Sequence, residues 1–449
     1  MSPGARRIIL SLVAIVVVAG IAAVWIIRGP GPMAFGTGPN VALADYKGAN
    51  PTGVPASLAQ ASIVERGEYL AKAADCMVCH TTPGGKEYAG GLGFKLPFGM
   101  LYSTNITPDK ETGIGNYSDQ DFLNAMHRGI RRDGARLYPA MPYTSYTYVS
   151  DADALAIKAY LFSLPPVRST PPGNTLAFPF NQRWAMGFWS AVFNPDTRFE
   201  PDTSKSPEWN RGAYLAEALA HCGECHTPRN LAFALNNRKK FAGAVTAGWR
   251  AFNISSDKNT GLGAWSDNDL VSYLSIGHAE GHGTASGPMG EAVDHSFSKL
   301  APEDIRAVVA YLRSVPAIAS TDLPATLAPP APASHRDGGG AADPRGKMVF
   351  EGACVSCHGW TGESALSRFA TLTGAWAVND PGAINVAQIV ISGTKRHTPE
   401  DAISMPAFGS AYSDIEIAAV ANYVTARFGS KGSQLTAQDV AELRKQTAQ

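Results

Sequence analysis

The pattern of apolar and polar positions begins with a long apolar stretch near the N-terminus. Residues 8–27 are mostly apolar, with Arg6 and Arg7 before them and Arg28 after them. A helix of about twenty residues spans about 30 Å, which is the thickness of a bilayer core. The pattern therefore predicts a membrane anchor within residues 1–34, and a cleaved secretory signal is the alternative. Both alternatives export the rest of the chain, since the paired arginines keep the N-terminus cytoplasmic.

Apolar residues recur at helical spacing in three further segments, which predicts three amphipathic helices. These are "SDADALAIKAYLFSL" from Ser150, "APEDIRAVVAYLRSV" from Ala301 and "SDIEIAAVANYVTARF" from Ser413. Two of them begin with the serine and acidic residue of a capping box, and the other has Pro302 at its first helical position. The high contents of glycine and proline, 45 and 31 residues, predict irregular loops between helices.

An opening segment that contains a glycine precedes each of these closing helices: "RGEYLAKAADC", "RGAYLAEALAHC" and "RGKMVFEGAC". Glycine inside a helix costs about 1 kcal/mol relative to alanine, so Gly67, Gly212 and Gly346 need a packing reason. We expect each opening helix to cross its closing helix at this glycine. The side chains expected at the crossings are Tyr160, Tyr311 and Tyr423.

Two linkers separate the three pairs of opening and closing segments, and a tail follows the last pair. Residues 171–204 contain an aromatic-rich segment, Phe178 to Phe193, which is either a connector packed on a neighbour or a helix at the bilayer surface that helps to line a quinone site. Residues 319–342 are rich in proline, alanine and glycine and predict an extended tether or clasp that lets the last unit sit apart. The tail, residues 431–449, is predicted to contain a short polar helix.

All six cysteines lie in three C-x-x-C-H motifs. The pairs are Cys76 and Cys79, Cys222 and Cys225, and Cys354 and Cys357, followed by His80, His226 and His358. Two thiols on one helical turn can add to the vinyl groups of one haem, and the next residue then offers an imidazole to the iron. Zinc binding and thiol redox chemistry are alternatives for a single copy, but zinc sites collect a second ligand pair and redox thiols need no histidine. Three copies predict three covalently bound haem c groups.

A repeat identifies candidates for the second axial ligand of each iron. "NITPDKETGIGNYSDQDF" from Asn105 matches "NISSDKNTGLGAWSDNDL" from Asn253 at a constant offset of 148 residues, and the same offset carries Met141 onto Met289. In all three units a methionine, Met405 in the third, follows a glycine by twelve residues. Loops bounded by proline and glycine can carry these thioethers across the haem face. The candidate axial pairs are His80 with Met141, His226 with Met289, and His358 with Met405.

Other residues compete for two of these positions. Met100 is a rival for the first iron, and His278 or His282 would give the second iron two histidines. The methionines could also fill core gaps without binding iron. The basic segment from His127 to Arg136 can pair with haem propionates or lie in solvent, and His127 itself is not expected to bind iron.

Each unit resembles a class I cytochrome c domain, with an opening helix, C-x-x-C-H, loops, a methionine and a closing helix. The chain from residue 64 to residue 429 is similar to the three-haem cytochrome c subunit of membrane-bound periplasmic alcohol and aldehyde dehydrogenases of acetic acid bacteria. The resemblance is strongest in "RGEYLAKAADCMVCHT", "LYSTNITPDKETGIGNYS", "LYPAMPYTSY" and "RGAYLAEALAHCGECHTPRN". It implies an all-α fold, with three tandem class I cytochrome c domains behind one N-terminal transmembrane helix. The domains are expected at residues 59–170, 205–318 and 343–430, which we call the first, second and third units.

The resemblance also implies a function in electron transfer. The subunit would take electrons from a catalytic dehydrogenase subunit and pass them through three haems to ubiquinone. Its haem domains would lie on the periplasmic side of the bacterial inner membrane. A molybdopterin aldehyde dehydrogenase with an iron–sulfur subunit is favoured as partner over a quinoprotein alcohol dehydrogenase. The reason is that quinoprotein-type relatives usually carry a cleaved signal, whereas this N-terminus resembles an anchor.

Other classes of function fit the sequence less well. The formal net charge is zero, so a nucleic acid partner is not expected. A haem enzyme such as a peroxidase needs an open iron position, which three His/Met pairs would not leave. No independent substrate-oxidising site is seen in the sequence. A free membrane-anchored electron carrier, or a cytochrome subunit that feeds a terminal oxidase, is the alternative function.

Overall fold

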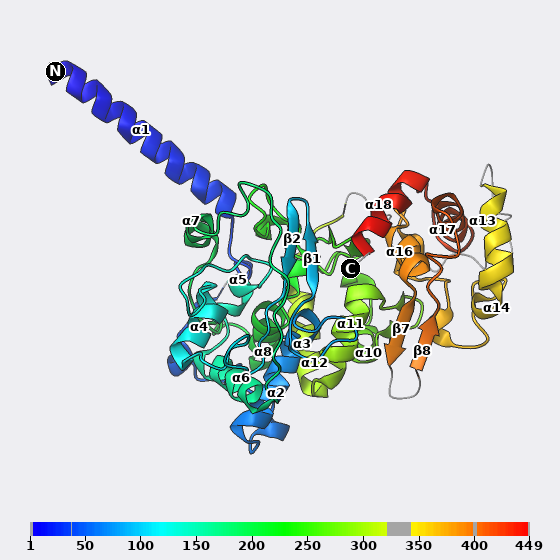
Figure 1. Cartoon of the computed structure of the whole chain (residues 1–449), viewed down its shortest axis with the longest axis horizontal. Coiled ribbons are helices and arrows are strands. Elements are labelled where there is room, and N and C mark those ends of the chain that lie inside the picture. Colours follow the sequence, from blue (N-terminus) through cyan, green and yellow to red (C-terminus); the bar gives the residue numbers. More distant parts are fainter. Residues whose placement is uncertain (1–2, 37, 321–342, 398–401, 448–449) are drawn as a thin grey trace.

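The computed structural model describes residues 3–36, 38–320, 343–397 and 402–447 (Figure 1). The described chain is largely helical, as the sequence predicts, and long irregular loops join its helices. Within these residues, four short antiparallel hairpins depart from the all-α expectation. Their strands are β1 Gly93–Leu96 with β2 Gly99–Tyr102, β3 Ala244–Thr246 with β4 Trp249–Ala251, β5 His278–Ala279 with β6 Gly283–Thr284, and β7 Thr394–His397 with β8 Ala402–Met405.

The N-terminal helix α1, Pro3–Arg28, projects from the body of the protein and is almost entirely exposed (Figure 1). Its most apolar window has a mean hydropathy of 2.9, and the helix is long and apolar enough to cross a membrane. Its last turn is tied to the loop 230–238 of the second unit. The Asn230 amide donates to the carbonyl oxygen of Ile27 at 3.1 Å, and the Arg238 guanidinium donates to that of Ile26 at 2.7 Å. These hydrogen bonds fix the place where α1 joins the body.

Three pairs of crossing helices organise the body, one in each unit. The pairs are α2 Ile63–Ala73 with α6 Asp151–Ser163, α8 Pro207–Ala213 with α12 Pro302–Ser314, and α13 Pro344–Val349 with α17 Asp414–Phe428. At each crossing, a Cβ built on the glycine would overlap a backbone carbonyl oxygen of the closing helix and lie 2.9 Å from the Cβ of a tyrosine. The contacts are Gly67 with Tyr160, Gly212 with Tyr311, and Gly346 with Tyr423. The predicted role of the three glycines is confirmed.

Replacing Gly212 by alanine should destabilise the protein by about 1–3 kcal/mol, because the added methyl group meets the backbone of α12 at Ala307. Gly352→Ala is a matched control, since a Cβ at Gly352 would meet nothing within 4 Å and should be neutral or slightly stabilising. Thermal unfolding of both variants, followed by circular dichroism, measures the difference. Equal unfolding temperatures would contradict the close crossing.

A third helix in each unit ends at the glycine that precedes the candidate methionine. The helices are α4 Asp119–Arg128, α10 Asp267–Ile276 and α16 Ile384–Ser392, and they end at Gly129, Gly277 and Gly393, with φ of +59°, +71° and +69°. Gly129 and Gly277 have the left-handed conformation, which glycine adopts at little cost and which commonly ends helices, whereas Gly393 combines a positive φ with an extended ψ. The constant interval from glycine to methionine therefore reflects a shared helix end.

The longest repeat in the sequence has a structural role. The Asn105 side chain accepts a hydrogen bond from the backbone N–H of Thr107 at 2.9 Å. Its amide group donates to the carbonyl oxygen of Val167, beyond the end of α6, at 2.7 Å. Asn253 makes the equivalent two hydrogen bonds in the second unit, at 2.9 and 2.6 Å. The repeated asparagine therefore ties a loop of each unit to the chain that leaves its closing helix.

The first and second units share one continuous apolar core. Two buried hydrogen bonds cross reciprocally between them. The Tyr69 hydroxyl of α2 donates to Asp304 of α12, and the Tyr214 hydroxyl, just after α8, donates to Asp153 of α6, both at 2.6 Å. Each tyrosine oxygen also accepts a backbone N–H at the start of the same closing helix, at 3.1 Å. The two units therefore pack as a pseudo-symmetric pair.

The third unit has a core of its own and is docked on the second unit. The guanidinium of Arg396 in β7 is buried and donates to the Asp294 carboxylate of the second unit at 2.8 Å. Arg250 of β4 forms an ion pair with Asp380 of the third unit at 3.0 Å. Buried charges need such well-placed partners, so the docking has a defined geometry. The expectation that this unit sits apart is wrong.

The remaining linker and tail predictions have different outcomes. Of the predicted tether, residues 321–342 lie outside the described residues. The tail contains α18, Ala437–Thr447, as predicted, and this helix packs on α16 and α17. Thr436 caps it, since its hydroxyl accepts the backbone N–H of Asp439 at 3.2 Å. The tail therefore forms part of the third unit.

Candidate functional site

Each C-x-x-C-H motif lies on a helical turn that follows an opening helix. The turns are α3 Cys76–Cys79, α9 Gly223–His226 and α14 Val355–His358. The cysteines of a pair are three residues apart, so a helical turn brings both thiols to one face. All six cysteines are free thiols, and the first of each pair packs against the core of its unit. This arrangement fits two thioether bonds to one haem.

The three motif histidines are held alike. Their Nδ1 atoms lie 2.7 Å from the carbonyl oxygen of Thr104 for His80, 2.6 Å from that of Phe252 for His226, and 2.6 Å from that of Ala370 for His358. A carbonyl oxygen only accepts, so each Nδ1 carries the proton and each Nε2 keeps its lone pair for a metal. Burial lowers the pKa of all three imidazoles, which favours the neutral form that a metal requires.

The motifs do not fit the two alternative chemistries. Burial raises the pKa of Cys76 and of Cys222 to about 12, so these thiols lack the low pKa of a redox-active nucleophile. Among the residues that the structure describes, no three His, Cys, Asp or Glu side chains gather as a zinc site requires. The residues present therefore fit a haem c better than zinc or a catalytic thiol pair.

The candidate methionines lie in three different local structures. Met141 lies in a loop just before α5 Tyr143–Tyr146, as expected. Met289 lies instead in the first turn of α11 Gly287–His295, and Met405 ends β8. Pro288 explains the helix, because proline is favoured in a first helical turn. All three methionines are half-buried. In each unit, the methionine and the first cysteine of the motif pack against the same apolar core. Their binding to iron stays a prediction.

The rival ligands have other contacts. Met100 lies in β2, where its side chain lies across the hairpin against Gly93. Nδ1 of His278 is 2.9 Å from the Thr284 hydroxyl, and the ring of His282 stacks on another ring of the second unit with centroids 3.8 Å apart. These contacts orient both imidazoles, and a second iron held by two histidines stays an alternative prediction.

Two buried indole N–H groups, Nε1 of Trp265 and Nε1 of Trp376, have no hydrogen-bond partner in the described part of the chain. Their rings touch nearly at right angles, with centroids 5.0 Å apart. Buried donors are normally paired, so these two fit an acceptor supplied by a bound group, such as a haem carboxylate. Sequence reasoning missed both residues. For Trp265 a signal was present, since it replaces Tyr117 in the repeat.

The basic segment from His127 to Arg136 pairs mostly with the protein's own carboxylates. Arg128 forms an ion pair with Asp196 at 3.1 Å, and Arg131 forms one with Asp133 at 3.0 Å. The structure therefore gives these arginines partners other than haem propionates. His127 is buried, and this burial, with help from a nearby arginine, lowers its pKa to about 4.

The segment after Met141 brings the first two motifs together. The Tyr146 hydroxyl of α5 donates to the carbonyl oxygen of Ala74, next to the first motif, at 2.8 Å. Its ring packs against His221, next to the second motif, with centroids 5.5 Å apart. Ser145 donates to Glu224, inside the second motif, at 3.2 Å. The first two motifs are therefore linked by direct side-chain contacts.

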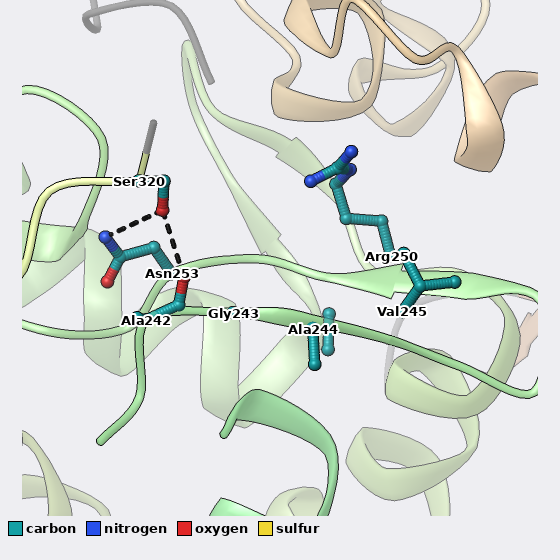
Figure 2. A pocket seen from close by; sticks show the side chains of 8 residues that line it. Ala242, Gly243, Ala244, Val245, Arg250, Asn253 and Ser320 are labelled. Atoms are coloured by element: carbon teal, nitrogen blue, oxygen red, sulfur yellow. Dashed lines mark hydrogen bonds between the residues drawn. The ribbon is translucent and has the colours of Figure 1, made fainter. Parts of the chain in front are cut away.

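A small pocket lies at the base of the β3–β4 hairpin (Figure 2). Asn253 and Ser320 meet at its edge, and the Ser320 hydroxyl donates to the carbonyl oxygen of Ala242 at 3.0 Å. Its volume is about 100 Å³, far below the roughly 300–1,000 Å³ of a small-molecule site. No motif residue lines it. We interpret it as part of the asparagine contact that closes the second unit.

Comparison with known proteins identifies similar chains. The family model for cytochrome c matches residues 64–165 and 344–427. The chain is 38% identical to the fructose dehydrogenase cytochrome subunit of Gluconobacter japonicus, over 88% of this chain and 85% of that protein. It is 39% identical to the gluconate 2-dehydrogenase cytochrome c subunit of Pantoea cypripedii, over 86% and 90%. It is 41% identical to a nicotinate dehydrogenase subunit of Pseudomonas putida over 82% of this chain, but it spans only 31% of that longer protein.

Proposed function

We propose, because the chain belongs to the family of dehydrogenase cytochrome c subunits, that it carries electrons through three haem c groups from a catalytic dehydrogenase subunit to ubiquinone. Electron transfer follows from membership of the family. The number of haems, the catalytic partner and the ubiquinone acceptor are the parts that we propose.

The proposal rests on one observation that is repeated in all three units. In each unit, Nδ1 of the motif histidine donates a hydrogen bond to a backbone carbonyl oxygen. A haem c, when bound, takes up or releases one electron at its iron. The paired cysteines of each motif would hold its edge, and Nε2 of His80, His226 and His358 would bind the iron. Met141, Met289 and Met405 are the proposed second ligands.

The arrangement of the units supports an order of electron flow. Helix α1 joins the body beside the connector helix α7, Ala185–Phe193, at an edge formed by the first two units (Figure 1). The third unit lies on the opposite side of the body (Figure 1). Close to its motif, Trp360 and Leu366 are 59% and 73% exposed, which suits a contact with another protein. We infer that electrons enter at the third unit and leave near α1.

Some aromatic residues of the connector are exposed in a way that suits contact with the bilayer surface. Trp184 and Phe188 are 67% and 72% exposed around α7, next to α1. Leu231, in the loop that holds the end of α1, is fully exposed. Trp189 points inward instead, since its indole N–H donates to the carbonyl oxygen of Ala232 at 2.8 Å. We call Trp184, Phe188 and Leu231 the membrane patch and propose that it lies in the surface of the inner membrane, with the three units on the periplasmic side.

Replacing both Trp184 and Phe188 by serine should lower the amount of mild detergent that releases the full-length protein from membranes. Each exposed aromatic side chain contributes roughly 1–2 kcal/mol when it is buried in the bilayer surface. If the quinone site lies here, the KM for a soluble ubiquinone analogue should also rise. Trp360→Ser is the control, since it removes an equally exposed aromatic group from the third unit. Release at the wild-type detergent concentration would rule out the membrane patch.

In this proposal, the substrate is oxidised by a separate catalytic subunit and not by this chain. We keep a molybdopterin aldehyde dehydrogenase with an iron–sulfur subunit as the first candidate partner, because the N-terminus has the length and apolar character of an anchor. A quinoprotein alcohol dehydrogenase is the second candidate. The similar chains are named for fructose, gluconate and nicotinate dehydrogenases, so the oxidised substrate differs among relatives.

Purification from membranes under mild detergent tests the proposal, with a pyridine haemochrome assay and mass spectrometry of every co-purifying chain. We expect about three haems c per chain, from the three motifs, and a large catalytic subunit. Three haems without such a partner would favour the free carrier or the oxidase-linked cytochrome. Fewer haems would mean that one motif does not bind haem.

A further inference from the structure

One loop of the third unit, Ala370 to Trp376, contacts the motif histidine of its own unit and the residue that holds the motif histidine of the second unit. Its first residue supplies the carbonyl oxygen that accepts the Nδ1 proton of His358 at 2.6 Å. Its last residue, Trp376, packs its ring on Phe252 of the second unit, with centroids 5.4 Å apart. Phe252 supplies the carbonyl oxygen that accepts the Nδ1 proton of His226 at 2.6 Å. The loop therefore joins the peptide that holds one histidine to the peptide that holds the other.

Hydrogen bonds hold both ends of this loop on the β5–β6 hairpin of the second unit. At the first end, the Thr284 hydroxyl donates to the carbonyl oxygen of Phe369 at 3.0 Å. At the other end, the backbone N–H of Trp376 donates to the carbonyl oxygen of His282 at 3.0 Å. The Phe369 ring also packs on His278, with centroids 5.0 Å apart. The loop is therefore part of the interface and not a free surface loop.

Glycines allow the loop and the hairpin to touch backbone to backbone. A Cβ built on Gly283 would lie 2.8 Å from the Cβ of Ala375. A Cβ built on Gly374 would lie 3.0 Å from the carbonyl carbon of Gly281. The ion pairs of Arg396 and Arg250 described above hold the same two units together. No room for a water layer is left at these two glycines.

We propose that the loop Ala370–Trp376 is the electron bridge between the third and second haem sites. The inference rests on the proposed function. With haem c bound at both motifs, one electron would pass from the site held by His358, which would be oxidised, to the site held by His226, which would be reduced; no bond would break and no proton would move. The loop acts by filling the space between the two histidine-holding peptides with packed atoms, which couple redox centres better than water or a void. Trp376 is a positioning residue in this bridge.

The test injects an electron into the third unit of the full-length protein with its haems bound. A ruthenium photoreductant is attached to a cysteine introduced at Met348, which is 61% exposed on α13. Flash photolysis then follows the absorbance change as the electron leaves the third site. In Trp376→Leu this redistribution should slow several-fold, whereas Trp376→Phe, which keeps an aromatic ring but lacks the indole N–H, should slow it less. Ile415→Ala, which shortens an exposed side chain on α17 of the same unit, should leave the rate unchanged.

Two further measurements separate the possible causes. Small-angle scattering shows whether the third unit stays docked, and a redox titration shows whether the potentials are unchanged. A slowed rate with intact docking and unchanged potentials supports the bridge. A wild-type rate in docked Trp376→Leu overturns it, and so does slowing that Trp376→Phe shows equally. If the wild type contains fewer than three haems, or no electron leaves the third site, the proposed function fails instead.

Discussion

Replacing Cys222 and Cys225 by serine is expected to remove about one third of the haem, given one haem per motif, and to destabilise the first unit as well. The reason is the core that the first two units share, against which Cys222 packs. Without its haem, the core that Cys222 contacts would be left incompletely packed. The hydrogen bond from Tyr214 to Asp153 then loses its support. Haem content per chain, together with limited proteolysis and mass spectrometry of the fragments, measures both effects.

The matched variant is the replacement of Cys354 and Cys357 by serine. The third unit has a separate core, so this variant should lose a similar share of haem while the first two units resist protease as in the wild type. Both variants lose one haem, so a difference in protease resistance between them reports the shared core and not the loss of a haem as such. Equal protease resistance of the first unit in both variants would show that the shared core does not couple the first two units.

Arg396→Ala is expected to cost about 3–5 kcal/mol of the stability of the docked third unit, because it leaves the buried Asp294 carboxylate without its guanidinium. Arg396 also donates to the carbonyl oxygen of Ala285 at 2.9 Å, so a second buried acceptor loses its donor. The third unit should therefore undock at a lower denaturant concentration than in the wild type. Small-angle scattering along a urea series detects the undocking.

A double variant separates charge from packing. Arg396→Met together with Asp294→Leu removes both charges and should recover most of the lost stability, because apolar replacements of a buried ion pair are often neutral. If the double variant undocks as early as Arg396→Ala, the lost packing and hydrogen bonds of the Arg396 side chain, and not the charge left on Asp294, cause the undocking.

The sequence predicted the parts of the fold that depend on local pattern. The crossings at Gly67, Gly212 and Gly346 followed from one rule, that a glycine inside a helix needs a packing reason, and the structure has all three. The C-x-x-C-H spacing is equally local. The capping box at Ser413 formed as predicted, whereas at Ser150 only the serine caps the helix, because the Asp153 carboxylate accepts hydrogen bonds from Gly53 and Tyr214 instead. The Nδ1 hydrogen bonds of the motif histidines could not be predicted, because their acceptors lie twelve to twenty-six residues away in irregular loops.

Contacts between units were the weakest part of the prediction. The Pro/Ala/Gly composition of residues 319–342 indicates a tether, but it contains no information on where the tethered unit docks. That depends on Arg396 and Trp376, whose partners lie more than ninety residues away in the chain. Met289 was expected in a loop because of its neighbours, yet Pro288 begins a helix there. Glycine and proline mark a boundary in the chain, but the fold decides whether a helix starts or a loop continues.

The reciprocal tyrosine–aspartate hydrogen bonds have a consequence for how the protein is made. Asp153 of the first unit meets a tyrosine about sixty residues later in the chain, and Tyr69 meets Asp304 only more than two hundred residues later. The first unit cannot complete its core until the second has been synthesised. On the proposed function, the cysteines of the first unit would stay reachable for haem attachment during that interval, while the third unit, with its separate core, would close as soon as its own residues had emerged.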